Sequence, residues 1–181
     1  MRQVVLINGV PASGKSTVAA GFVDYLSNND VPVAPFSLDI VKECLFSHVG
    51  TGDREYNRML GRASYHSIFA SLAVFPERLV PIIDAWHGFQ PAQVLQDHLK
   101  AAKIDHVVEV WCKVSPAVAA ARYRARAAKR SAGHPAASYA DELYELTTRA
   151  RPLALWPVVE IDAESAVGEM QFEAIRAHLR L

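Results

Sequence analysis

The chain has 181 residues, 51% of them hydrophobic and 21% charged, and its 19 lysines and arginines balance its 19 aspartates and glutamates. This composition is typical of a globular protein and excludes a disordered chain. Without a cationic excess, nucleic acid and anionic membranes are disfavoured as partners, and a small ligand is the better expectation. The two cysteines do not have the spacing of metal ligands, and the apolar start of the chain does not have the layout of a secretory signal peptide. No apolar run approaches about 18 residues. We therefore expect a cytoplasmic protein without a membrane anchor.

The chain starts with a strand, a glycine-rich loop and a helix in succession. Val4–Ile7 is a short apolar run rich in β-branched residues, as expected of a strand buried on both faces. Apolar residues recur at three- and four-residue spacing through Thr17–Leu26, which predicts a helix. Between them lies "GVPASGKS", a full match to the P-loop or Walker A pattern, in the structural order that this pattern requires.

The P-loop predicts a site for polyphosphate. Its backbone N–H groups and the N-terminus of the following helix attract an anion, and Gly9 and Gly14 allow backbone conformations that a side chain would obstruct. Lys15 can reach the β- and γ-phosphates as a catalytic residue, and Ser16 can bind Mg²⁺. We expect the nucleotide to contact the loop throughout, at Gly9, Val10, Pro11, Ala12, Ser13, Gly14, Lys15, Ser16 and Thr17.

Strands and helices alternate along the rest of the chain. Four more strands are predicted, at Val33–Ser37, Leu79–Trp86, Asp105–Cys112 and Pro157–Asp162. Further helices are predicted at Ile40–Ser47, Glu55–Val74, Pro91–Ala102, Pro116 to about Gly133, Tyr139–Arg149 and Ala166–Leu179. In the second of these, the candidate core residues are Met59, Leu60, Ala63, Ile68 and Leu72. The order predicts a single α/β domain over residues 1–181, with a parallel sheet that binds ligands at the carboxyl ends of its strands.

Three acidic residues, Asp39, Asp84 and Asp162, lie at the ends of predicted strands, and we expect Asp162 to be structural because the fifth strand lies farther from the acceptor site. Asp39 comes after the second strand, and we expect it to cap the next helix and to act near the γ-phosphate, as general base toward an acceptor hydroxyl or as a partner of Mg²⁺. Asp84 ends the third strand, and we expect it to hold Mg²⁺ together with Ser16 and to face the substrate. The alternative for each is a purely structural role, as a helix cap or a loop-initiating residue.

The segment "DAWHGFQP" continues from the third strand into a loop. Trp86 and His87 are in a position to contact the acceptor, because loops at this end of the sheet carry binding residues. The alternative is that Trp86 and Phe89 fill the core below the loop, while His87 lies in solvent.

Arginines recur in the helix predicted after the fourth strand. Arg122, Arg126 and Arg130 are four residues apart, so they share one face of that helix. Guanidinium groups can neutralise charge on a phosphoryl group in transfer, and the small residues that follow suit a moving lid near residues 122–140. The alternative is a solvated cationic face with no role in the site.

Taken together, several segments resemble the small P-loop kinases, a group that includes the chloramphenicol phosphotransferases, the zeta toxins and the polynucleotide-kinase-like enzymes. The similar segments are "LINGVPASGKST", "FSLD", "IIDAW", the arginines and "VVEID", which together span almost the whole chain. The resemblance implies a three-layer P-loop NTPase fold, with a five-stranded parallel sheet of order 2-3-1-4-5. It also implies ATP with Mg²⁺, Asp39 as the base, and phosphate binding by Arg122, Arg126 and Arg130.

The sequence therefore favours an ATP-dependent kinase that transfers the γ-phosphoryl group to a hydroxyl of a small molecule. Choice of the acceptor is expected to reside in Val49–Trp86. A nucleotide-dependent regulatory ATPase and a nucleic-acid end kinase are the alternatives, of which the second is disfavoured by the neutral net charge. A signalling GTPase is disfavoured because the chain has no guanine-reading NKxD segment.

Overall fold

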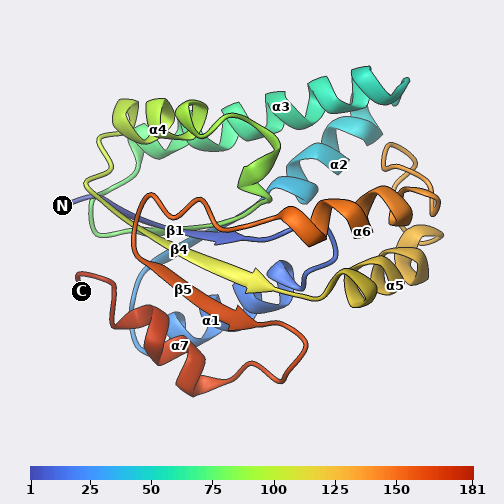
Figure 1. Ribbon diagram of the computed structural model, residues 1–181. Coiled ribbons are helices and arrows are strands. Elements are labelled where there is room, and N and C mark those ends of the chain that lie inside the picture. The colour runs from blue at the N-terminus through green and yellow to red at the C-terminus, as the bar shows by residue number, and fades with distance from the viewer.

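A computed structural model describes all residues from 1 to 181 and has a five-stranded sheet at its centre (Figure 1). The strands are β1 (Gln3–Asn8), β2 (Val33–Ser37), β3 (Val80–Asp84), β4 (His106–Lys113) and β5 (Val158–Asp162). Neighbouring strands are parallel throughout and lie in the order β2-β3-β1-β4-β5. This confirms the strand order of the P-loop NTPase fold.

Helices cover both faces of the sheet. They are α1 (Lys15–Asn28), α2 (Leu38–Val49), α3 (Arg54–Ser71), α4 (Ala92–Ala101), α5 (Pro116–Ala127), α6 (Tyr139–Arg149) and α7 (Glu169–Arg176), with 3₁₀ turns at η1 (Leu72–Val74) and η2 (His87–Phe89). In Figure 1, α1 and α7 lie below the sheet, while α3 and α4 lie above it. No helix has the length and apolar character needed to cross a bilayer.

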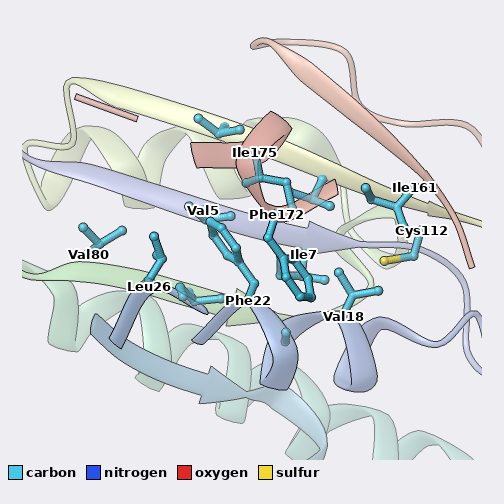
Figure 2. Packing of buried hydrophobic residues seen from close by; sticks show 14 of the residues in the cluster. Val5, Ile7, Val18, Phe22, Leu26, Val80, Cys112, Ile161, Phe172 and Ile175 are labelled. Atoms are coloured by element: carbon cyan, nitrogen blue, oxygen red, sulfur yellow. The ribbon is translucent and has the colours of Figure 1, made fainter. Parts of the chain in front are cut away.

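The largest part of the core lies between the sheet, α1 and α7 (Figure 2). Successive residues of a strand point to opposite faces, so Val5 and Ile7 of β1 face these helices. There they meet Phe22 of α1 together with Phe172 and Ile175 of α7. Burial of such side chains supplies the main favourable free energy of folding, because it removes apolar surface from water.

The other face of β1 packs against α3 and α4. Ile68 and Leu72 are buried there, and Leu60 of α3 is also buried, as the sequence predicts. Met59 is 46% exposed and Ala63 is also exposed, so the prediction that they belong to the core is wrong. The face of α3 that meets the sheet is displaced from the predicted one, and Ser64, Tyr65 and Phe69 fill it instead.

Helix α5 is shorter than the sequence predicts, and it ends at Ala127. The next amides bond to carbonyls only three residues back, Lys129 to Arg126 and Arg130 to Ala127, which ends the α-helical pattern. The chain then turns toward α2, where Gly133 packs so closely on the Phe46 ring that a Cβ atom would collide with it. Arg130 therefore lies outside the helix, and the prediction that it shares a helical face with the other two arginines is wrong.

A polar cluster within the sheet joins four segments. The Glu109 side chain of β4 is fully buried and accepts hydrogen bonds from Asn8 Nδ2 at 2.7 Å and from the amides of Leu153 and Ala154 at 2.9 and 3.0 Å. The Asn8 Oδ1 atom accepts from the amide of the adjacent Gly9 at 2.8 Å and from the amide of His87 at 3.0 Å. This Asn8–Glu109 cluster holds the start of the P-loop, the loop after β3 and the segment after α6 in fixed relative positions.

We expect Glu109→Ala to destabilise the protein by about 3 kcal/mol, because one buried donor and two half-buried donors lose their acceptor, at about 1–3 kcal/mol for a buried one and less for the others. Glu109→Gln keeps one acceptor oxygen and should cost less. Urea denaturation measures both variants. Glu160→Ala is the matched control, because Glu160 lies in the neighbouring strand but is exposed to solvent. Equal losses for Glu109→Ala and Glu160→Ala would contradict a structural role for the cluster.

Candidate functional site

A cavity of about 860 Å³ opens at the carboxyl ends of the strands. The parallel register places the ends of three adjacent strands side by side, with Asp84 of β3 opposite both Ile7 of β1 and Ser37 of β2. The predicted site residues that line the cavity are Pro11, Ala12, Gly14, Lys15, Ser16, Thr17, Asp39, Asp84, Trp86, Arg126 and Arg130. Those that do not line it are Gly9, Val10, Ser13, His87 and Arg122.

The P-loop has a backbone that only glycine fits at its first position. Gly9 has φ +151°, and a Cβ atom there would come within 2.9 Å of the Cys112 carbonyl oxygen. Gly14 has φ +95° and directly precedes α1. Lys15 donates a hydrogen bond from Nζ to the Val10 carbonyl at 2.9 Å. Burial lowers the pKa of Lys15, while Asp84 and Asp39 act in the opposite direction and favour its charged form.

Ser16 and Asp84 meet at the floor of the cavity. The Ser16 hydroxyl donates to Asp84 Oδ2 at 2.6 Å. Asp84 is only 7% exposed, and burial raises its pKa, while the charge of Lys15 and the Ser16 hydrogen bond oppose that rise. A hydroxyl and a carboxylate are the hard oxygen ligands that Mg²⁺ prefers, and Mg²⁺ commonly takes few protein ligands beside phosphate oxygens and water. The two residues thus fit a magnesium ion beside the P-loop.

Asp39 is the second residue of α2 and does not cap it. The capping position is Ser37, so the prediction of an Asp39 cap is wrong: the helix starts earlier than expected and leaves Asp39 inside its first turn. The Asp39 carboxylate instead accepts a hydrogen bond from Arg130 at 2.6 Å. Burial alone would raise the pKa of Asp39, but Arg130 and the other nearby cations outweigh it and hold that pKa below its usual value.

The segment between α5 and α6, residues 128–138, also contacts α2 at two further places. His134 Nε2 lies 2.6 Å from Glu43 Oε1, and Gly133 packs on Phe46. Burial and the nearby cations Arg130 and Lys42 lower the pKa of His134 to about 4, so the neutral ring donates a hydrogen bond at neutral pH. The three contacted positions of α2, which are Asp39, Glu43 and Phe46, lie on one face of the helix. We call this set of contacts the α2 dock.

The three predicted arginines lie in different surroundings. Arg122 donates to the Ala163 carbonyl at 2.9 Å and lies beside Gly14, outside the main cavity. Arg126 lines the cavity, and its buried Nε has no hydrogen-bond partner. Burial lowers the pKa of Arg126, and the charge of Arg130 acts in the same direction. Of these three arginines, Arg126 is therefore the one that lines the cavity and has a buried donor without a partner.

The residues after β3 follow the structural alternative only in part. Trp86 and Phe89 line the cavity, and Phe89 also packs against the core beside Tyr65, as that alternative expects. His87 is only 2% exposed, and its Nδ1 lies 2.9 Å from the hydroxyl oxygen of Tyr65, so it is not a solvated residue. Burial lowers the pKa of His87 to about 3, which keeps the ring neutral at physiological pH. Trp86 is thus available to a ligand, while His87 lies beneath the cavity wall.

A second row of arginines, on α3, was not recognised from the sequence. Arg54, Arg58 and Arg62 line the cavity and are four residues apart. The arginines that begin at Arg122 have the same spacing, so the same pattern could have indicated both sets. Arg54 makes two hydrogen bonds to Glu142 of α6, and Arg62 makes one to Glu55 at 2.8 Å. The spacing of apolar residues in this helix predicts which residues enter the core, but it does not indicate which polar residues line a cavity.

Three solved structures share this fold. A protein from Chloroflexus aurantiacus, proposed to be a kinase, superposes with a TM-score of 0.76 at 20% identity and covers 99% of this chain and 98% of its own. APE1195 gives a TM-score of 0.63 at 19% identity, with 97% and 96% covered. Chaetomium thermophilum Kti12, solved in complex with ADP-AlF3, gives 0.61 at 15% identity, with 96% and 94% covered. At these identities the similarity concerns the fold.

The family is shown by the sequence itself. No curated protein of similar sequence was found. Residues 4–152 match the sequence model of a family described as an AAA domain, and this range runs from β1 past the end of α6. It contains the P-loop, Asp39, Asp84 and the arginines on both sides of the cavity. The chain therefore belongs to this AAA domain family.

Proposed function

We propose that this protein is an ATP-dependent kinase that transfers the γ-phosphoryl group to a hydroxyl of a small molecule. The proposal rests on one observation: a single cavity contains Lys15 of the P-loop, the Ser16–Asp84 pair and the carboxylate of Asp39. Its volume of about 860 Å³ lies toward the upper end of the range of about 300–1,000 Å³ usual for ligand sites. It has room for a nucleotide and for a small acceptor beside it.

The nucleotide would bind through the P-loop. Its backbone N–H groups and Lys15 would contact the β- and γ-phosphates, and Lys15 would exchange its present bond to the Val10 carbonyl for phosphate oxygens. Mg²⁺ bound at Ser16 and Asp84 would neutralise charge on the phosphate oxygens. Membership of the AAA domain family and the ADP-AlF3 in the Kti12 complex support a nucleotide at this position.

Asp39 would orient the acceptor. Its carboxylate is ionised at neutral pH, because Arg130 and neighbouring cations hold its pKa low, so it can accept a hydrogen bond from an incoming hydroxyl. The hydroxyl oxygen attacks the γ-phosphorus, the bond from phosphorus to the bridging oxygen of ADP breaks, and the hydroxyl proton passes to Asp39. A low pKa makes Asp39 a weak base, which suits a loose transition state in which positioning matters more than proton removal.

Residues 122–140 would act as a lid over both substrates. Arg126 lines the cavity and its buried Nε has no partner, while Arg130 is held by Asp39 and Glu43 of α2 and lies 3.1 Å from His134 Nε2. When an acceptor hydroxyl takes over Asp39, Arg130 becomes available to the phosphoryl oxygens. The α2 dock would be the resting contact of this lid.

Acceptor dependence of ADP release tests the function as a whole. Sugars, nucleosides, antibiotics and polyols are added separately to the protein with ATP and Mg²⁺, and ADP is measured. A kinase releases ADP only when an acceptor is present. Release at one constant rate with every acceptor and with none would identify a regulatory ATPase instead.

Lys15→Ala should abolish phosphoryl transfer and leave the fold intact, because the side chain contacts phosphate and takes no part in the core. Turnover and urea denaturation are measured side by side. Lys113→Ala, which removes an exposed lysine at the end of β4, is the control and should keep wild-type activity. Full turnover by a folded Lys15→Ala protein would refute the assignment of the P-loop.

Asp39→Asn and Asp84→Asn should fail in different ways. Loss of the base at Asp39 should lower kcat by about 10²- to 10⁴-fold, with ATP affinity close to normal. Asp84→Asn should raise the Mg²⁺ concentration needed for half-maximal rate, because it weakens the surroundings of the ion. Both quantities are measured for both variants across a Mg²⁺ titration. If Mg²⁺ alone rescues Asp39→Asn, the base lies elsewhere and Asp84 becomes the leading candidate.

At least one lid arginine should stabilise the transition state, and Arg126 is the first choice because its buried Nε lacks a partner. We expect Arg126→Ala to lower kcat by about 10³-fold. Arg124→Ala on the same helix is the control, since Arg124 lies outside the cavity and pairs with Asp141. Wild-type rates in alanine variants of Arg122, Arg126 and Arg130 alike would show that these arginines are only a solvated face.

A further inference from the structure

Beside the main cavity lies a smaller one of about 470 Å³, which we call the side chamber. It lies between α2, the first turns of α3 and the segment that runs from Ala132 into α6. Lys42, Arg58 and Tyr139 are among the residues that line both cavities, so the side chamber and the main cavity adjoin. The P-loop does not reach the side chamber.

The charged side chains of the chamber have an excess of cations. They are Lys42, Arg54, Arg58 and Glu142, which sum to a net charge of +2. Glu142 is already bound to Arg54 through two hydrogen bonds. Neither Lys42 nor Arg58 is hydrogen-bonded to any acid, and the remaining cation contact of Lys42 is with the ring of Phe46. In a chain of zero net charge, this is a local concentration of unneutralised charge.

The acidic residues near Lys42 do not cancel this excess. Asp39 is engaged by Arg130, and Glu43 is engaged by His134. His134 itself lines the chamber but is neutral at physiological pH, because burial and the cations around it keep its pKa near 4. Lys42 and Arg58 thus line one open chamber without an acid partner, which is an arrangement that suits an oxyanion.

The chamber adjoins the proposed reaction centre. Lys42 follows Asp39 by three positions on α2, so the two side chains lie on the same face of the helix one turn apart. A molecule that bound through one end at Lys42 and Arg58 would carry its other end toward Asp39.

We infer that the acceptor is a small phosphate monoester, whose phosphate binds Lys42 and Arg58 in the side chamber while its free hydroxyl reaches Asp39. The inference rests on the proposed kinase function and names its substrate class. A phosphate monoester carries nearly two negative charges at neutral pH, which matches the +2 of the chamber, whereas a carboxylate carries one. An extended nucleic-acid backbone is disfavoured, because a chain of zero net charge lacks the cationic excess that binding to such a backbone usually requires.

The reaction would add a second phosphate to the acceptor. The hydroxyl oxygen forms a bond to the γ-phosphorus as the bond to ADP breaks, and the proton passes to Asp39. The products are ADP and a bisphosphorylated compound. The phosphate in the chamber takes no part in bond making and serves only to position the hydroxyl.

The test measures binding, so that it does not depend on finding the natural acceptor. The protein is saturated with Mg²⁺ and a non-hydrolysable ATP analogue, which fills the P-loop, and is then titrated with inorganic phosphate by calorimetry. We expect one phosphate to bind. Arg58→Gln should weaken this binding by about tenfold to a hundredfold, as for the loss of one charge-assisted hydrogen bond. Affinity for the ATP analogue should not change.

Arg176→Gln is the matched control, since it removes the same charge from the exposed surface of α7, and it should bind phosphate as the wild type does. Titrations with succinate and with a short oligonucleotide without terminal phosphates distinguish other anions, and both should bind at least tenfold more weakly. Phosphate binding that is absent, or equal in Arg58→Gln and wild type, overturns the inference. So does tighter binding of succinate or the oligonucleotide. Failure of the ATP analogue to bind refutes the proposed function itself.

Discussion

The structure depends on a buried carboxyl group that accepts three hydrogen bonds. Glu109 lies within the central sheet, where a polar side chain is costly unless it is hydrogen-bonded. Asn8 supplies one donor, and the amides of Leu153 and Ala154 supply the others. The same Asn8 side chain also accepts the first amide of the P-loop. The geometry of the phosphate site is therefore linked to the interior of the sheet rather than set by the loop alone.

The distribution of charge explains how a neutral chain can carry a strongly ionic site. Cationic side chains approach the cavity from α3, from α5 and from the segment after α5. Some of them are neutralised within the protein, as Arg54 is by Glu142 and Arg130 is by Asp39. Those without an acid partner, chiefly Arg58 and Arg126, face the space that substrates would enter. Cations that pair with a carboxylate therefore connect the walls of the cavity, and cations without such a partner are available to a ligand.

Motifs and the spacing of apolar residues predicted those helices, strands and loops whose conformation depends on residues nearby in the sequence. The P-loop lies between a strand and a helix as expected, and α6 spans Tyr139–Arg149 as predicted. Strand order is a long-range property, and it came from the resemblance to P-loop kinases rather than from the pattern of apolar residues. The cavity brings together Asp39, Asp84 and Arg126 because parallel strands end at one edge of the sheet.

Features that depend on distant partners could not be predicted in this way. The end of α5 is set by contacts of the following segment with α2, which lies 91 positions earlier in the chain. Glu109 stands within an apolar run, and nothing near it in the sequence identifies its donors. The sequence around His87 is typical of a loop, yet the side chain is buried and lies within hydrogen-bond distance of the Tyr65 hydroxyl of α3.

The α2 dock has a consequence for the evolution of the protein. It combines an ion pair, a hydrogen bond and a close fit of Gly133 on an aromatic ring, each with its own demand on shape or charge. A substitution on either side alters what the opposite side tolerates. Residues 39–46 and 130–134 should therefore vary together among relatives, and a chimera that exchanges one stretch would need to inherit the other from the same parent.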